Sequence, residues 1–177
     1  RRVLERLERG VDWDACGVLQ LAFDAKEAER QAQLAAAFPP GLLQPLTQAE
    51  AEQRAGIALP SGGLFYPEAG WAHPPALCRL LARHPNIQLL THHEALSIRR
   101  ADGEWQALGA DGLLAAAPIL VLANATDAAT FEPTHHLPLK RIRGQITRVP
   151  ATPASRALRT VLCAEGYVAP PRGSEHT

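Results

Sequence analysis

The sequence has no methionine, only three cysteines and no excess of charge of either sign. Eighteen basic residues balance eighteen acidic ones, so the overall charge does not favour binding to nucleic acid or to a membrane surface. No apolar run approaches the roughly 20 residues of a membrane span, and the first residues do not resemble a signal peptide. Cys16, Cys78 and Cys163 lie far apart in no C-x-x-C pair, which argues against a disulfide framework or a zinc site. We therefore expect a cytoplasmic protein without membrane contact.

Short catalytic motifs are missing as well. The sequence contains no G-x-G-x-x-G, no phosphate-binding G-x-x-x-x-G-K-[ST], no H-E-x-x-H and no G-x-S-x-G, so a self-contained nucleotide or hydrolase site is not expected. Two pairs of adjacent histidines are present, at residues 92–93 and 135–136. Neighbours in a strand point to opposite faces, so neither pair predicts a metal site.

The sequence resembles the interior of a longer protein. It has the size and the hydrophobic content, 46%, of one ordinary globular domain. It nevertheless begins at Arg1-Arg2-Val3, in a pattern typical of the middle of a helix that would extend to Gly10. We expect residues 1–177 to be an internal fragment of one domain.

A buried strand is predicted at residues 119–125, which read I-L-V-L-A-N-A. Four apolar residues in succession are typical of a strand covered on both faces, as in a parallel sheet, although a buried helical turn is the alternative. Ligands bind at the carboxyl ends of such strands, and small residues there let a cofactor approach the backbone. Ala123, Asn124 and Ala125 are therefore candidate cofactor-binding residues.

The remaining elements follow from caps, turns and periodicity. Asp24-x-x-Glu27 and Thr47-x-x-Glu50 resemble capping boxes that begin two helices, and Pro74-Pro75 begins a third. Asp-Gly turns at residues 102–103 and 111–112 predict a three-stranded meander. The predicted strands are residues 17–23, 87–90, 94–101, 104–109, 113–117 and 137–149, with a last hairpin over 160–169. The aromatic, glycine-rich loop at residues 61–73 either lines a pocket or fills the core.

A few polar side chains are candidates for binding. Lys140, Arg141, Arg143 and Arg148 form a local basic cluster, which is either a solvated strand face or a site for a carboxylate or phosphate. Tyr167 follows a turn, so its hydroxyl either reaches a pocket or is structural.

The order of these pieces resembles the D-amino-acid-oxidase-like flavoproteins, which include glycine and sarcosine oxidases. The resemblance covers nearly the whole chain from Gly17, and P-L-K-R-I-R-G-Q-I is its most general block. The blocks G-V-L-Q-L-A-F-D, G-G-L-F-Y-P-E-A-G-W and V-L-C-A-E-G-Y-V-A-P are most similar to those of family members that modify the wobble uridine of tRNA. We expect an α/β (mixed α+β) fold, a fragment of an FAD-binding Rossmann-like domain with a β-meander, interleaved with an antiparallel-sheet substrate domain.

The resemblance also implies roles for particular segments and residues. Residues 74–127 would belong mainly to the FAD domain, and residues 1–73 and 128–177 mainly to the substrate domain. The position of Ala95 would touch the adenine end of FAD through its backbone, and the triplet at residues 123–125 would lie against the dinucleotide. The family usually has glycine where Ala125 stands. Tyr167 would hold the substrate carboxylate, with Arg143 adding positive charge, and no catalytic residue is implied.

The function implied by the resemblance is FAD-dependent oxidation of the carboxymethylaminomethyl group of tRNA wobble uridine. A fused methyltransferase domain that uses S-adenosylmethionine would lie upstream. The pyrophosphate of FAD is held mainly by a glycine loop at a helix N-terminus, which would lie before Arg1, so we expect residues 1–177 alone to bind FAD weakly or not at all. Two alternatives remain, an oxidase of glycine, sarcosine or D-amino acids, and a non-enzymatic RNA-binding module, which the zero net charge disfavours.

Overall fold

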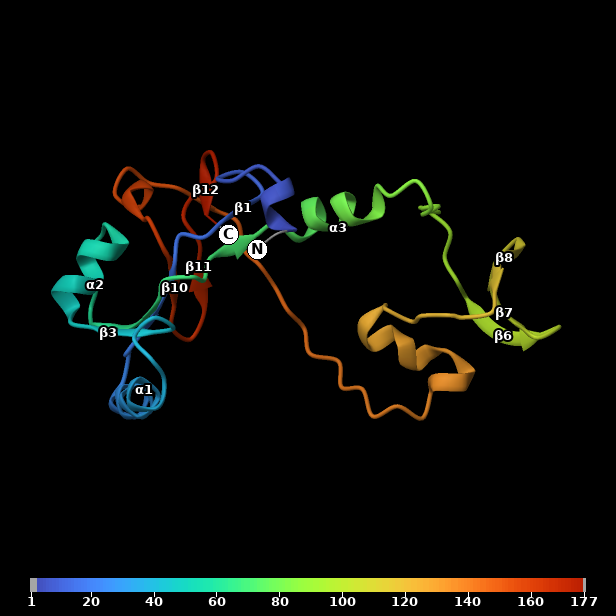
Figure 1. Cartoon of the computed structure of the whole chain (residues 1–177), viewed down its shortest axis with the longest axis horizontal. Helices are drawn as coiled ribbons and strands as arrows, with labels where there is room; N and C mark the ends of the chain where they lie inside the picture. Colours follow the sequence, from blue (N-terminus) through green and yellow to red (C-terminus); the bar gives the residue numbers. More distant parts are fainter. Residues whose placement is uncertain (1–2, 177) are drawn as a thin grey trace. The chain divides into compact units, whose positions relative to one another are not determined.

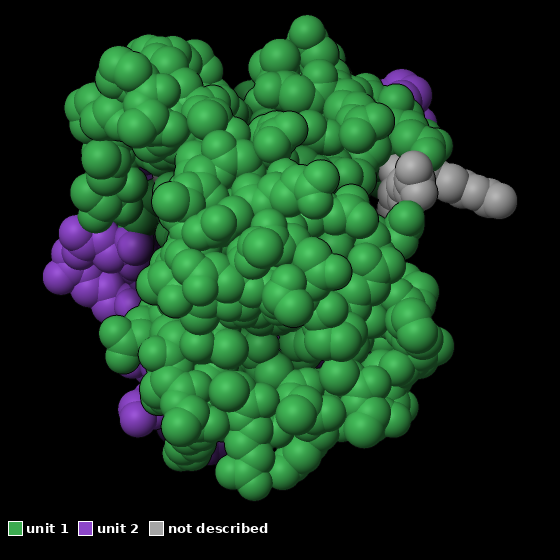
Figure 2. Space-filling view, turned by 90° about the vertical axis from the view of Figure 1, so that its left-hand side faces the viewer, with its two compact units in different colours: residues 1–84, 146–177 green, residues 85–145 purple. Residues whose placement is uncertain are grey.

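The computed structural model of the chain describes residues 3–176, and these divide into two compact units (Figures 1 and 2). Unit 1 comprises Arg1–His84 together with Ile146–Thr177, and unit 2 comprises Pro85–Gln145. Figure 2 draws unit 1, which combines these two stretches, in green. Helices and several sheets occur together, which confirms the expected mixed α/β class.

A five-stranded sheet forms the centre of unit 1, in the spatial order β11-β10-β2-β4-β3. Neighbouring strands are antiparallel except β2 and β10, which are parallel. The Thr160 hydroxyl supports this parallel pair by donating to the Gly17 carbonyl at 2.7 Å, across 143 positions of sequence. The strands are β2 (Val18–Leu21), β3 (Gln44–Leu46), β4 (Gly63–Tyr66), β10 (Val161–Cys163) and β11 (Tyr167–Val168).

Two capped helices accompany this sheet. Helix α1 (Ala25–Ala37) begins at Asp24, whose carboxylate accepts from the Glu27 backbone N–H. Helix α2 (Gln48–Ala55) begins with a complete capping box between Thr47 and Glu50 and ends at Gly56, which has a φ of +80°. Both predicted helix starts are thus confirmed. Helix α2 contributes its buried alanines to a core with Leu19, Leu21 and Phe65.

Helix α1 is fastened to the sheet by a buried glutamine that sequence reasoning did not single out. Gln31 is 4% exposed, and its amide donates to the carbonyls of Gln20 and Leu21, each at 3.2 Å, and to the Glu27 carboxylate at 2.9 Å. Because the Gln31 amide would otherwise lose its hydrogen bonds to water, these contacts fix the helix against β2.

The stability of unit 1 is expected to fall on acidification because of Glu27. Hydrogen bonds from Arg30 and then Gln31 lower the pKa of the Glu27 carboxyl from 4.5 to about 2. A carboxyl with a depressed pKa stabilises the folded state above its unfolded pKa and loses that contribution as pH falls through its folded pKa. The contribution should therefore disappear between about pH 4.5 and about pH 2. Urea titrations across this range should show a shallower pH dependence in Glu27→Gln; an unchanged dependence would contradict the assignment.

The rest of unit 1 contains shorter elements. Helix α3 (Pro74–Ala82) begins at the proline pair as predicted, and the hairpin of β10 and β11 confirms the one expected over residues 160–169. The predicted first helix is reduced to the 3-10 helix η1 (Leu4–Arg6), and Arg1 and Arg2 lie outside the described residues. Two short antiparallel strand pairs belong to the same unit: β1 (Trp13–Asp14) with β5 (Trp71–Ala72), and β9 (Val149–Pro150) with β12 (Glu175–His176). A further 3-10 helix, η4, comprises Ser155–Ala157.

The predicted meander is confirmed as the sheet of unit 2. Strands β6 (Ser97–Ala101), β7 (Glu104–Gly109) and β8 (Gly112–Ala117) pair antiparallel in that order. Asp102 and Gly103 have φ values of +53° and +80°, which is the geometry that an Asp-Gly hairpin turn requires. The 3-10 helices η2 (Ala125–Thr130) and η3 (Glu132–Thr134) follow.

Three predicted strands are wrong for this structure. Residues 119–125 carry no strand, and Ile119 and Val121 are each 78% exposed. Residues 87–90 are likewise not a strand, and of residues 137–149 only Val149 belongs to one. A strand exists only where a second strand accepts and donates its backbone hydrogen bonds, and within residues 3–176 these segments, apart from Val149, pair with none.

Residues 3–176 contain neither a candidate membrane span nor a candidate metal-binding cluster. None of the helices there has the length and hydropathy needed to cross a membrane. In that same part of the chain, histidine, cysteine, aspartate and glutamate side chains form no group of three that could hold a metal ion.

Candidate cofactor and substrate sites

Unit 2 contains an open cavity of about 520 Å³. One wall comes from the loop before β6 and from the meander, and the other from the segment that continues into η2 and η3. Three of the four predicted cofactor residues, Ala95, Ala123 and Asn124, lie in these walls. The complete lining is Glu94, Ala95, Ile98, Ala107, Leu120, Val121, Leu122, Ala123, Asn124, Asp127, Thr130 and Phe131.

Local contacts explain why these residues meet. The Leu96 N–H donates to the Leu108 carbonyl at 2.8 Å, which holds the loop that carries Ala95 against β7. Ile98 and Ala107 are register partners across β6 and β7, so both side chains lie on the same face of the meander, which forms the floor of the cavity. Phe131, only 6% exposed, anchors the opposite wall.

The fourth predicted cofactor residue, Ala125, is not part of the lining but has an unusual backbone. Its φ is +53°, a left-handed conformation that costs an L-residue with a side chain roughly 1–2 kcal/mol. Asn124 precedes it as the N-cap of η2, and the Asn124 carbonyl accepts from the Asp127 N–H at 3.2 Å. The chain therefore turns sharply at Ala125, which gives a physical reason for glycine at this position in the resembling flavoproteins.

Replacing Ala125 with glycine is expected to stabilise the start of η2 by about 0.5–1 kcal/mol. Glycine removes the left-handed strain, and its larger loss of backbone entropy offsets part of the gain. Amide hydrogen exchange across η2 should become slower. The matched control is Ala129→Gly in the same element, where no positive φ exists and exchange should become faster. Faster exchange in both variants would show that Ala125 is not strained.

Two carboxylates, Glu94 and Asp127, are the charged groups of the lining. Asp127 receives the Arg141 guanidinium at 2.6 Å, and both side chains are largely exposed. Sequence reasoning missed Asp127, Thr130 and Phe131 because the first two lie in the 3-10 helix η2, whose short period leaves no recognisable pattern, and Phe131 is the single residue between η2 and η3. The sequence feature that could have identified these three residues is their position shortly after the small-residue triplet at 123–125.

The two predicted substrate residues lie in different units. Tyr167 stands in β11 of unit 1, opposite Cys163, and is 62% exposed. Arg143 lies in an exposed, irregular part of unit 2 and donates to the Gln145 side-chain oxygen at 2.6 Å. Two roles stay predictions: that Tyr167 holds the substrate carboxylate, and that Arg143 adds positive charge near the flavin. Two further members of the basic cluster have acidic partners, Arg141 with Asp127 and Arg148 with Glu175.

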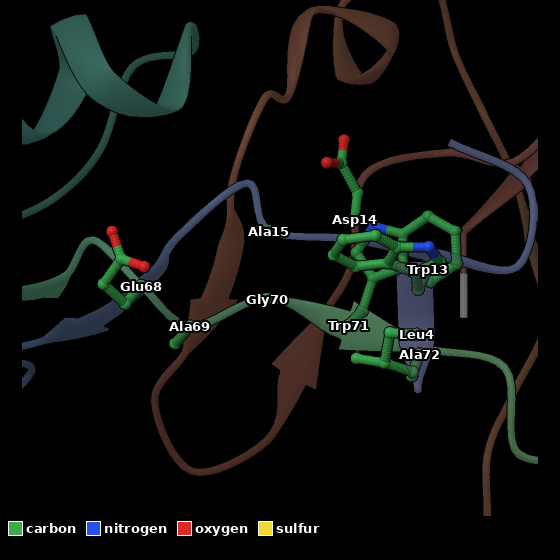
Figure 3. Close-up of a pocket in the computed structure, with 9 residues that line it drawn as sticks. All are labelled: Leu4, Trp13, Asp14, Ala15, Glu68, Ala69, Gly70, Trp71 and Ala72. Atoms are coloured by element: carbon green, nitrogen blue, oxygen red, sulfur yellow. The ribbon is translucent and has the colours of Figure 1, made fainter. Parts of the chain in front are cut away.

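Unit 1 has a smaller pocket, of about 220 Å³, beside the short pair of β1 and β5 (Figure 3). The loop at residues 61–73 serves both predicted purposes, since Phe65 is buried in the core whereas Trp71 lines this pocket. Close backbone approach shapes the pocket, because a Cβ on Gly70 would lie 1.9 Å from the Asp14 carbonyl oxygen. The lining is Leu4, Trp13, Asp14, Ala15, Glu68, Ala69, Gly70, Trp71 and Ala72.

Comparison with known proteins defines the class. The model of the FAD dependent oxidoreductase (DAO) family matches residues 1–177, and the chain belongs to this family. Over all 177 residues it is 68% identical to the tRNA 5-methylaminomethyl-2-thiouridine biosynthesis bifunctional protein MnmC of Pseudomonas putida and 67% identical to the protein of the same name from Pseudomonas aeruginosa. It spans 27% of the length of each of these relatives.

Solved structures show the same fold. Glycine oxidase from Geobacillus kaustophilus superposes with a TM-score of 0.69 at 22% identity, over 99% of this chain and 50% of that one. L-proline dehydrogenase from P. horikoshii superposes with a TM-score of 0.67 at 16% identity, over 99% of this chain and 50% of that one. The resemblance inferred from the sequence blocks is therefore confirmed at the level of family and fold.

Proposed function

We propose that the chain is the central part of an FAD-dependent oxidoreductase that converts the carboxymethylaminomethyl group of tRNA wobble uridine to aminomethyl, with release of glyoxylate, in the cytoplasm. The observation that carries this proposal is the 68% identity, over every residue of the chain, to a relative whose name states a role in tRNA 5-methylaminomethyl-2-thiouridine biosynthesis. That relative is also called bifunctional, and the chain spans 27% of its length. The remaining length has room for the upstream methyltransferase domain that would use S-adenosylmethionine.

The cavity of unit 2 fits one end of FAD. Its volume of about 520 Å³ lies within the usual range of ligand sites, roughly 300–1,000 Å³. Ala95, Ala123 and Asn124 would hold the cofactor, because the small side chains leave the backbone accessible to a flat ring. Glu94 and Asp127 disfavour the anionic pyrophosphate but accept hydrogen bonds from hydroxyl and amino groups, so the adenosine end is the part that this cavity suits. When bound, FAD would supply the two-electron oxidation of the carbon–nitrogen bond, and hydrolysis by water would then release glyoxylate and leave the aminomethyl group.

The chain's own contribution is to bind and orient the substrate. The carboxymethylaminomethyl group is an N-substituted glycine and therefore presents a carboxylate. The Tyr167 hydroxyl would donate to that carboxylate, and the Arg143 guanidinium, which belongs to the other unit, would add positive charge near the flavin. Exposure of both side chains leaves them accessible to a large substrate such as tRNA.

The test is a visible absorption spectrum of the whole protein that carries this chain, before and after anaerobic addition of tRNA with the carboxymethylaminomethyl group. We expect this tRNA to bleach the oxidised flavin band, while free glycine and sarcosine leave it unchanged. Bleaching by the free amino acids instead would identify an oxidase of small substrates. A protein without a flavin band would overturn the proposed function altogether.

A further inference from the structure

Two tryptophans from distant parts of the sequence line the pocket of unit 1 (Figure 3). Trp13 lies in β1 and Trp71 in β5, and these strands pair antiparallel, with Trp13 opposite Ala72 and Asp14 opposite Trp71. The Trp13 indole is 7% exposed and donates to the Leu7 carbonyl at 3.3 Å, whereas Trp71 is only partly buried. Trp13 is therefore a fixed wall, and Trp71 is the aromatic ring that a ligand can reach.

The size of the pocket limits what it can take. About 220 Å³ is below the roughly 300–1,000 Å³ of sites for drug-sized ligands, so a dinucleotide such as FAD does not fit. Figure 3 shows Leu4 beside the two indoles at one end of the pocket, so that end is apolar. A single flat ring with apolar faces suits this space, because aromatic rings stack on indoles regardless of their edge substituents.

The charged groups around the pocket determine which polar groups the edge of that ring can carry. Asp14 and Glu68 belong to the lining, and ionised carboxylates accept hydrogen bonds but repel anions. Two guanidinium groups already engage the pocket residues: Arg9 donates to Oδ1 of Asp14 at 2.7 Å, and Arg172 lies over one face of the Trp71 ring, 5.3 Å from its centroid. The pocket thus suits a neutral ring with N–H donors on its edge and an anionic group outside it.

We propose that this pocket binds one unpaired nucleobase of an RNA substrate, stacked on the face of the Trp71 ring that Arg172 does not cover, with its edge N–H groups donating to the Asp14 carboxylate and its flanking phosphate near Arg172. A nucleobase combines a flat apolar face, N–H donors and an attached anionic phosphate, which matches the three properties of the pocket. The inference deepens the proposed function, on which it depends, by giving the chain a contact to tRNA separate from the oxidised group.

The experiment is photo-crosslinking of the whole protein to an RNA hairpin whose loop carries bromouridine, with the crosslinked peptides identified by mass spectrometry. We expect crosslinks on peptides that contain Trp13 or Trp71. Trp71→Ala should lower their yield about tenfold, since base stacking on an aromatic side chain is worth roughly 1–3 kcal/mol. Trp71→Phe should keep most of the yield because it preserves a stacking face. Trp105→Ala, in unit 2, is the matched control and should leave the yield unchanged.

The outcomes separate this inference from the proposed function. The hairpin lacks the oxidisable group, so crosslinking does not depend on flavin reduction, while the flavin spectrum of each variant reports whether it is folded. Crosslinks confined to other peptides, or an unchanged yield in a Trp71→Ala variant that keeps its flavin, would overturn the base pocket. Failure of modified tRNA to bleach the flavin, with crosslinks at Trp71 intact, would overturn the proposed reaction instead.

Discussion

Replacing Gly17 with alanine is expected to destabilise unit 1 by roughly 2–5 kcal/mol, a large part of the stability of an ordinary domain. Gly17 has a φ of +80°, and a Cβ there would lie 2.3 Å and 2.4 Å from two carbons of the Phe65 ring. Phe65 is 5% exposed in the core, so its ring cannot move aside without disturbing its neighbours. Both the strain of a left-handed residue and the overlap with Phe65 therefore add to the cost.

The destabilisation should extend through unit 1, because hydrogen bonds at Gly17 join distant parts of the chain. Its N–H donates to the Ala69 carbonyl at 2.9 Å, and its carbonyl accepts from the Val161 N–H at 3.1 Å and from the Thr160 hydroxyl at 2.7 Å. Three separate parts of the sequence thus meet at one residue. A displaced backbone at Gly17 would break the hydrogen bonds that join β2 to β10 and would expose polar groups that have no other partner.

Gly10→Ala is the matched control for this prediction. Gly10 has a φ of +83°, but a Cβ there would meet nothing within 4 Å. Its substitution should cost only the left-handed strain, roughly 1–2 kcal/mol. Urea unfolding of both variants, followed by circular dichroism, measures the difference, which isolates the overlap with Phe65. Equal destabilisation of the two variants would show that the core around Phe65 adapts.

Elements with local signals could be predicted from the sequence. Thr47 and Glu50 satisfy each other's backbone groups within one turn, and Asp102-Gly103 forms a tight turn from two adjacent residues. In both cases every atom that decides the conformation lies within a few positions. The starts of α1 and α2, the meander and the last hairpin were therefore predictable.

Elements that depend on a distant partner were not predictable. Residues 119–125 have the composition of a buried strand, yet composition does not specify which segment will pair with them, and in this structure Ile119 and Val121 are exposed. The reverse holds for β2 and β10, whose parallel pairing joins Val18 to Val161 without any local signal. The approach of Trp13 to Trp71 likewise depends on the pairing of two distant segments, β1 and β5. Contacts between residues far apart in sequence form only after the intervening chain has closed into a loop, so no local pattern indicates them.

Two arguments led to the candidate cofactor residues: Ala123, Asn124 and Ala125 followed from the predicted strand as well as from the resemblance, whereas Ala95 followed from the resemblance alone. Ala95 and Ala123 are 28 positions apart by residue number, and their small size alone points to no ligand. The structure brings them to one cavity although the segment that carries Ala123 is not a strand. The loop before β6 and the turn at Ala125 are enough to form the two walls of the cavity, because each wall is held by its own backbone hydrogen bonds.

Replacing Ala123 with tryptophan is expected to lower the FAD content of the whole protein at least tenfold, which corresponds to about 1.4 kcal/mol or more of binding free energy. An indole at this position would fill part of the 520 Å³ cavity and displace the ring that the small side chain admits. Ala123 is exposed, so the substitution buries no new group in the core and should leave the fold intact.

The matched control is Ala116→Trp on β8, an exposed alanine of the same unit that is not part of the cavity lining. Purified variants are compared by the ratio of flavin absorbance to protein absorbance, corrected for the added indole, and by titration of the apoprotein with FAD. Full flavin content in Ala116→Trp with loss in Ala123→Trp would place the adenosine end of FAD in the unit 2 cavity. Equal retention in both variants would mean that FAD does not enter this cavity, and the roles proposed for Ala95, Ala123 and Asn124 would then be wrong.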